Sequence, residues 1–166
     1  SENDIHQRLQ RQMQRSCQQM RNEPEKVFRP LLAPQAWSDT HEEMIGGLQV
    51  GFSHTQGRRP TMEDEHLAIS FNLNIEGRNY PVQLFGLFDG HGGAEAARFV
   101  RDNLQRKLEQ SLAEYNQQGL TKAGIWKALK KACIRLNREF KDTQGWIADQ
   151  QGTTAAIAMI VDGKIW

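Results

Sequence analysis

The sequence has few cysteines, little net charge and no long hydrophobic run, and each absence excludes a class of protein. Two cysteines, Cys17 and Cys133, are too few for a disulfide framework and favour a reducing compartment such as the cytoplasm. The formal net charge of +1 gives no general attraction for nucleic acid or for an anionic membrane. No apolar stretch approaches the roughly 20 residues that span a bilayer, and no secretory signal pattern opens the chain. We therefore expect a cytoplasmic protein without a membrane span.

The first 45 residues differ in composition from the rest, and we predict that they form an extension. Residues 1 to about 23 are rich in Gln and Arg, and their helically spaced apolar stripe predicts an amphipathic helix, with the stripe formed by Ile5, Leu9, Met13, Cys17 and Met20. This helix either lies on its own domain or binds a partner. Three prolines follow between Pro24 and Pro34, and the polar, acidic segment Ser38–Glu43 is expected to cap a short turn. Gly46 and Gly47 mark the boundary, which gives a helical and proline-containing extension over 1–45 and a main domain over 46–166.

The main domain shows strands, then two helices, then strands again. Alternating polarity predicts strands over 48–55 and 67–73, and a hairpin connection over 76–79 leads to a buried strand over 82–88. Helical spacing predicts one helix over 94–112 and a second that begins at Thr121, which would be its N-cap. Cys133 is expected to be buried on the apolar face of the second helix. A strand over 155–161 is followed by Asp162-Gly163, a strong hairpin signal. This order predicts an α+β fold with mainly antiparallel sheets and not a doubly wound parallel sheet.

The most informative stretch runs from Leu84 to Gly93, where an apolar strand ends in Asp89, Gly90 and His91. Residues 90–93 are expected to form a tight turn between the strand and the next helix, because glycine lets the backbone approach an ion or a phosphate closely. A carboxylate, a backbone carbonyl and an imidazole in one turn are suited to an oxygen-ligated metal site with an adjacent proton donor.

Three segments, in this order, resemble the metal-dependent Ser/Thr protein phosphatases of type 2C. They are Arg59-Pro60-Thr61-Met62-Glu63-Asp64, then Phe88-Asp89-Gly90-His91-Gly92-Gly93, then Gly152-Thr153-Thr154-Ala155. Each segment alone is a weak signal, but the three together at family-like spacing are specific. The resemblance extends from about Gly47 to Trp166. It implies a β-sandwich of mainly antiparallel sheets flanked by helices, here ending after the first half.

The resemblance also implies a centre with two Mn²⁺ or Mg²⁺ ions. On the matching positions, Asp89 would bridge the two metals, Gly90 would offer its backbone carbonyl and Glu63 would bind one metal. Asp64 would hold a water that is itself bound to a metal. Hard cations of this kind prefer oxygen ligands and keep several waters, so few carboxylates are needed for each ion.

Two further residues would act on the substrate. The resemblance implies that Arg59 holds the phosphate, since a guanidinium matches phosphate bidentately. It implies that His91 protonates the leaving serine or threonine oxygen, because an imidazole can give up a proton near neutral pH. Thr154 matches a residue that lines the site. The expected activity is hydrolysis of phosphoserine and phosphothreonine on proteins, with Asp89 among the catalytic residues.

The chain also departs from the family pattern, because the remaining metal-binding aspartates of the family lie beyond the segment that this chain matches. We therefore expect the chain to supply the N-terminal half of the site and to have little activity alone, with the C-terminal half of the domain as a partner beside the phosphoprotein substrate. The chain would be a fragment of a phosphatase, the part of a phosphatase for which the sequence is given, or a natural truncated relative. The alternative is a pseudophosphatase that binds partners. A receiver-like domain with Asp89 as phosphoacceptor is disfavoured by the strand order.

Overall fold

The structure is a computed structural model that describes residues 38–166. The helix predicted over residues 1–23 and the proline-containing segment after it lie outside the described residues. Residues 38–40 and 52–60 belong to one compact unit, and residues 41–51 and 61–166 belong to another. None of the helices within residues 38–166 combines the length and the apolar character needed to cross a membrane.

The first two strands, β1 (Ser38–Ile45) and β2 (Leu48–Thr55), form a two-stranded sheet. Gly46 and Gly47, with φ of +55° and +86°, make the connecting turn, and the strand predicted over 48–55 is confirmed. The expectation that Ser38–Glu43 would cap a turn is wrong. These polar residues carry no clear strand signal of their own, but pairing with β2 provides their backbone hydrogen bonds.

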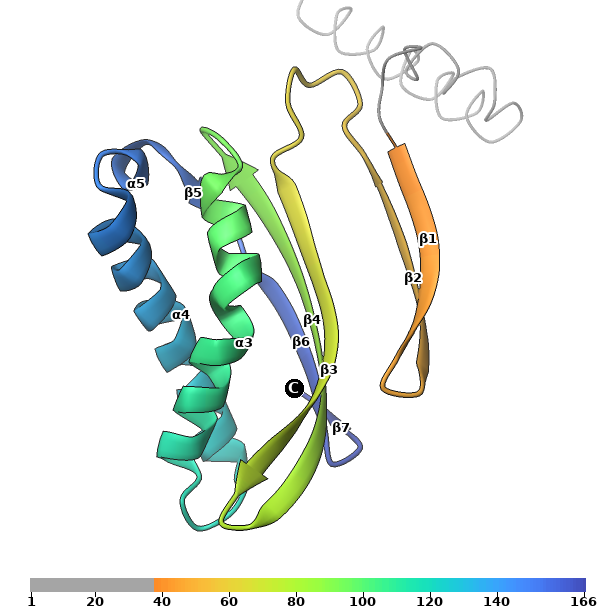
Figure 1. The fold of residues 1–166 in the computed structure, drawn as a ribbon, viewed down its shortest axis with the longest axis vertical. Helices are drawn as coiled ribbons and strands as arrows, with labels where there is room; N and C mark the ends of the chain where they lie inside the picture. The colour runs from red at the N-terminus through yellow and green to blue at the C-terminus, as the bar shows by residue number, and fades with distance from the viewer. Residues whose placement is uncertain (1–37) are drawn as a thin grey trace, which may run out of the picture. The chain divides into compact units, whose positions relative to one another are not determined.

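The main sheet is antiparallel, with the strand order β3-β4-β6-β7 (Figure 1). It contains β3 (Asp64–Ile75), β4 (Arg78–His91), β6 (Ala156–Val161) and the short β7 (Lys164–Ile165). A two-residue strand, β5 (Gly152–Thr153), pairs with the end of β4. The hairpin predicted at Asp162-Gly163 is confirmed, because both residues have positive φ, as a type I′ turn requires.

Two long helices, α3 (Glu95–Tyr115) and α4 (Lys122–Gln144), lie on one face of this sheet (Figure 1). Thr121 caps α4 as predicted, since its hydroxyl accepts a hydrogen bond from the Gly124 N–H at 3.0 Å. The short helix α5 (Ile147–Gln150) was not predicted. The observed fold is therefore α+β with antiparallel sheets and two long helices, and this confirms the predicted class.

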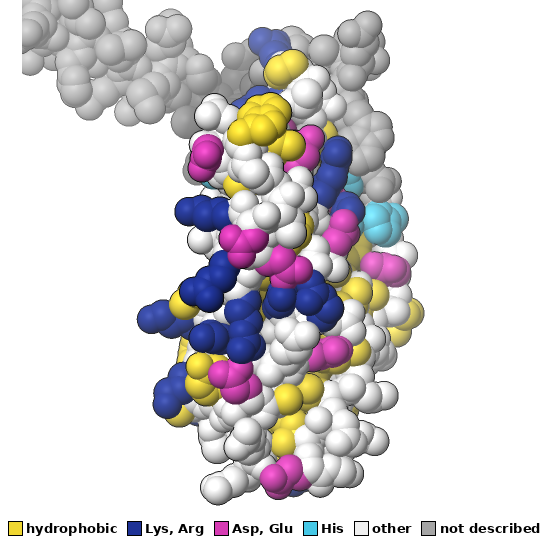
Figure 2. Space-filling model, turned by 60° about the vertical axis from the view of Figure 1, so that its left-hand side comes forward, with side chains coloured by type: hydrophobic (Ala, Val, Ile, Leu, Met, Phe, Trp, Pro, Cys, Tyr) yellow, Lys and Arg dark blue, Asp and Glu magenta, His cyan; other side chains and the backbone are white. Residues whose placement is uncertain are grey.

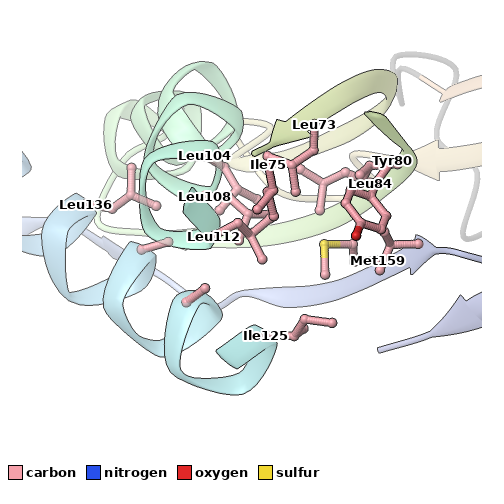
Figure 3. Packing of buried hydrophobic residues seen from close by; sticks show 14 of the residues in the cluster. Leu73, Ile75, Tyr80, Leu84, Leu104, Leu108, Leu112, Ile125, Leu136 and Met159 are labelled. Atoms are coloured by element: carbon pink, nitrogen blue, oxygen red, sulfur yellow. The ribbon is translucent and has the colours of Figure 1, made fainter. Parts of the chain in front are cut away.

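The core lies between the helices and the inner face of the sheet (Figure 3). Strand alternation places Leu84 and Phe88 of β4 on this face, where they meet the buried stripe of α3 formed by Leu104, Leu108 and Leu112. Each fully buried side chain of this size contributes about 1.5–3 kcal/mol to folding. The packing thus holds β4 and α3 rigidly in place. The segment from Asp89 to Gly93 ends β4 and leads into α3, so it lies on a rigid scaffold.

The prediction that Cys133 is buried is wrong. Cys133 is exposed, because it lies at the edge of the buried stripe of α4 and opens into a surface cavity. It lines a cavity of about 180 Å³ between α3, α4 and the β5–β6 region, together with apolar side chains such as Phe140. Partial burial there raises the pKa of the Cys133 thiol.

Candidate metal and phosphate site

The predicted site residues Asp64 and Asp89 lie directly opposite each other where β3 begins and β4 ends. The backbone of Asp89 forms its hydrogen bonds on the side away from β3. Its N–H donates to Thr154 Oγ1 at 3.3 Å, and its carbonyl accepts from the Thr154 N–H at 2.9 Å. Toward β3, Asp64 and Asp89 therefore form a non-hydrogen-bonded pair, the kind in which facing side chains come closest. Both side chains point away from the helices, since the neighbouring Phe88 is buried against them.

Gly90 lets the backbone of Glu63 approach the end of β4, next to Asp64 and Asp89. A Cβ added to Gly90 would lie 2.4 Å from the Glu63 carbonyl oxygen and 3.2 Å from that of Gly93, so only glycine fits there. The Glu63 side chain accepts a hydrogen bond from the Thr61 hydroxyl at 3.0 Å, which restricts its orientation. The structure thus brings Glu63 and Gly90 together, next to the two paired aspartates.

These donors are all oxygens, and this chemistry suits Mn²⁺ or Mg²⁺. The number of side chains is smaller than a complete site would need. Within residues 38–166, no group of three or more His, Cys, Asp or Glu side chains lies close enough together to hold a metal ion. The donor types therefore fit a hard cation, and their role as metal ligands stays a prediction.

His91 is the last residue of β4 and pairs with Gly152 of β5. A Cβ added to Gly152 would lie 2.5 Å from His91 Nε2, so the imidazole lies against the bare backbone of β5. The predicted turn over 90–93 is therefore partly wrong. Pairing with β5 extends β4 to His91, and only Gly92 and Gly93 have positive φ, +74° and +137°.

The C-terminal end of α5 contacts the glycines before α3 and the first residue of that helix, and this contact was not predicted from the sequence. Gly92 packs closely against the Gln150 carbonyl oxygen, and Gly93 packs against the Gln151 side chain. Gln151 Oε1 also accepts a hydrogen bond from the Glu95 N–H at 3.1 Å, next to the first turn of α3. Backbone hydrogen bonding, followed by that of Gln151, lowers the pKa of Glu95. The only sequence signal for this contact was the run of glycines on both sides of it.

Arg59, the predicted phosphate ligand, belongs to the other compact unit. It lies in a turn in which its N–H donates to the Gln56 carbonyl at 3.3 Å and its own carbonyl accepts from Gln56 Nε2 at 2.7 Å. Its side chain is exposed. The role of Arg59 stays a prediction.

Lys and Arg side chains gather on the face of the molecule seen in Figure 2, with Asp and Glu among them. Ion pairs also link the two long helices. Arg106 and Lys107 of α3 both contact Glu139 of α4, and Arg135 of α4 contacts Glu114 of α3. These pairs join the two helices, and the more exposed of them, such as Arg106–Glu139, contribute only about 0–1 kcal/mol each.

The sequence is similar to those of several protein phosphatases of type 2C. A family model described as Protein phosphatase 2C matches residues 48–166. Protein phosphatase 2C homolog 2 of Schizosaccharomyces pombe is 32% identical over 129 residues, which cover 76% of this chain and 33% of that protein. Probable protein phosphatase 2C 27 of Arabidopsis thaliana is 32% identical over 131 residues, which cover 76% of this chain and 32% of that protein. The chain therefore spans about a third of the length of these curated relatives.

Among solved structures, that of a C. elegans sex determining protein is similar with a TM-score of 0.46 and 19% identity. The match covers 76% of this chain and 26% of that chain. A likeness at this level indicates no function.

Proposed function

Because this chain belongs to the protein phosphatase 2C family, we propose that it supplies the N-terminal half of a site that hydrolyses phosphoserine and phosphothreonine on proteins. The observation that carries the proposal is the register of β3 and β4, which sets Asp64 opposite Asp89. The close approach of Gly90 to Glu63 adds further oxygen donors at the same end of the sheet.

In this proposal the Asp89 carboxylate, the Gly90 carbonyl and the Glu63 carboxylate hold Mn²⁺ or Mg²⁺. Such ions, bound as a pair, would lower the pKa of a water and neutralise charge on the phosphoryl oxygens. Asp64 would orient a water by accepting a hydrogen bond from it. The two hydrogen bonds that Thr154 makes with the backbone of Asp89, one through its hydroxyl and one through its N–H, support the role of Asp89, because they fix the backbone from which its carboxylate projects.

His91 would donate a proton to the leaving serine or threonine oxygen, and Arg59 would bind the phosphate with its guanidinium. The contact of the imidazole with Gly152 supports the first role, because it restricts the ring to one side of β5. The partners would be a phosphorylated protein and the C-terminal half of the domain, which would bring the remaining ligands. Residues 46–166 would belong to the catalytic domain and residues 1–45 to an extension.

The test is phosphate release from a phosphoserine or phosphothreonine peptide by the full-length protein, with Mn²⁺ and with a chelator. We expect release that requires the metal and is lost in Asp89→Asn. Asp162→Asn is the matched control, because Asp162 lies in the β6–β7 turn at φ +53°, a conformation that asparagine also tolerates. Residues 1–166 alone should release little phosphate.

Metal-independent release, or full activity in Asp89→Asn, would contradict the proposal. The absence of any release from the folded full-length protein would favour the second candidate, a pseudophosphatase that acts by binding partners.

A further inference from the structure

Three acidic residues follow one another at the start of β3, and the third of them, Glu65, has surroundings unlike those of the other two. Glu65 pairs with Phe88, which is only 1% exposed, whereas the neighbouring Asp64 pairs with Asp89. Successive residues of a strand point to opposite faces, so Glu65 points toward the helices while Asp64 points away from them. The side chain of Glu65 is only 18% exposed.

Both carboxylate oxygens of Glu65 are occupied by arginines of α3. Arg98 Nε lies 3.2 Å from Glu65 Oε1, and Arg101 contacts Glu65 Oε2 through a terminal guanidinium nitrogen. Arg98 and Arg101 are three residues apart, so they project from the same side of the helix. A carboxylate held in this way on the helix side of the sheet cannot serve as a ligand at the site described above.

The ion pairs connect the start of β3, which carries candidate ligands, with α3, the helix that follows the ligand-carrying end of β4. In β3, Asp64 directly precedes Glu65. Helix α3 begins at Glu95, shortly after β4 ends at His91. Since Asp64 and Asp89 exchange no backbone hydrogen bonds, the alternation of an antiparallel ladder makes Glu65 and Phe88 the first bonded pair at this end.

We propose that Glu65 is a positioning residue for this site. Its ion pairs with α3 prevent the end of the β3–β4 ladder from fraying and so keep Asp64 opposite Asp89. This inference rests on the proposed function, because it concerns the same site. Removal of a group that is hydrogen-bonded to a metal ligand typically lowers metal affinity by about 10- to 100-fold, and we expect Glu65, which acts through the backbone of β3, to lie at the lower end of that range.

The test compares Glu65→Gln, which keeps the size of the side chain and removes its charge, with Glu114→Gln. Glu114 is a matched control because it forms a similar ion pair with Arg135, at 2.5 Å, between α3 and α4. Amide hydrogen exchange of the full-length protein is the first readout, and Mn²⁺ titration by calorimetry is the second. We expect Glu65→Gln to exchange faster at residues 65 and 88 and to bind Mn²⁺ about 10-fold more weakly. Glu114→Gln should change neither quantity.

The two readouts separate the failure of this inference from that of the proposed function. Unchanged amide exchange at residues 65 and 88 in Glu65→Gln would overturn the inference, whether or not the Mn²⁺ affinity changes. Faster exchange with unchanged Mn²⁺ affinity would also overturn it, because the ion pairs would then serve the fold alone. If the unmodified protein binds no Mn²⁺, the proposed function fails and the inference fails with it.

Discussion

Replacing Gly90 with alanine should damage the site far more than it damages the fold. The added Cβ would lie 2.4 Å from the Glu63 carbonyl oxygen, about 1 Å inside the 3.4–4 Å range of an ordinary contact. The obstructing atom belongs to the backbone, so no side-chain rotation can relieve the clash, and β3 and β4 must separate at the ends that carry Asp64 and Asp89. Overpacking of this kind costs about 1–3 kcal/mol of stability. A displacement of about 1 Å at a catalytic site costs about 100-fold in rate.

The assay is metal-dependent phosphate release by the full-length protein, measured together with urea unfolding. Gly51→Ala is the control, because Gly51 lies in strand β2, has no positive φ and has only the Glu42 Cγ near the added Cβ, at 4.0 Å. We expect Gly90→Ala to remain folded and to lose about 100-fold in phosphate release, while Gly51→Ala keeps its activity. Equal activity of the two variants would refute the reasoning, because the close approach of Gly90 to Glu63 would then not matter for the site.

Three further predictions concern the scaffold, and each is measured by urea unfolding. Leu104→Ala should cost about 2–5 kcal/mol, because Leu104 is fully buried under the sheet; a loss below about 1 kcal/mol would contradict the packing. Thr121→Ala should cost about 1 kcal/mol through loss of the α4 cap, and Thr121→Ser should restore it. Ion pairing, first with Lys107, lowers the pKa of Glu139 below its ordinary 4.5. The contribution of the Glu139 carboxylate to stability is therefore present above pH 4.5 and is lost as the pH falls through the folded-state pKa. Glu139→Gln should accordingly lose less stability on acidification than the unmodified protein. An equal loss of stability in the two proteins would count against the pairing.

Local signals in the sequence predicted the elements that depend on local chemistry. The Thr121 cap and the Asp162-Gly163 turn are examples, since a hydroxyl at an N-cap and two residues that tolerate positive φ determine their own geometry. Strands β1 and β5 were not predicted. The first is too polar and the second too short to be recognised, and both exist because a distant strand pairs with them.

The candidate site shows the same division between local and long-range information. Residue types alone indicated oxygen ligands at Asp89 and Gly90, but only the resemblance to a family linked them with Glu63 and Asp64. The register that sets Asp64 opposite Asp89 depends on pairing across 25 positions of the chain, which no local pattern encodes. The opposite orientations of Asp64 and Glu65, adjacent acids of similar chemistry, follow from that register and so could not be assigned beforehand.

The most direct test of the account is whether the end of β4 binds a divalent cation. Calorimetric titration of the full-length protein with Mn²⁺ should show binding that weakens at least about 10-fold in Asp89→Asn and stays unchanged in Asp162→Asn. Equal Mn²⁺ affinity in the unmodified protein and in Asp89→Asn would contradict the account, because the paired aspartates would then hold no metal.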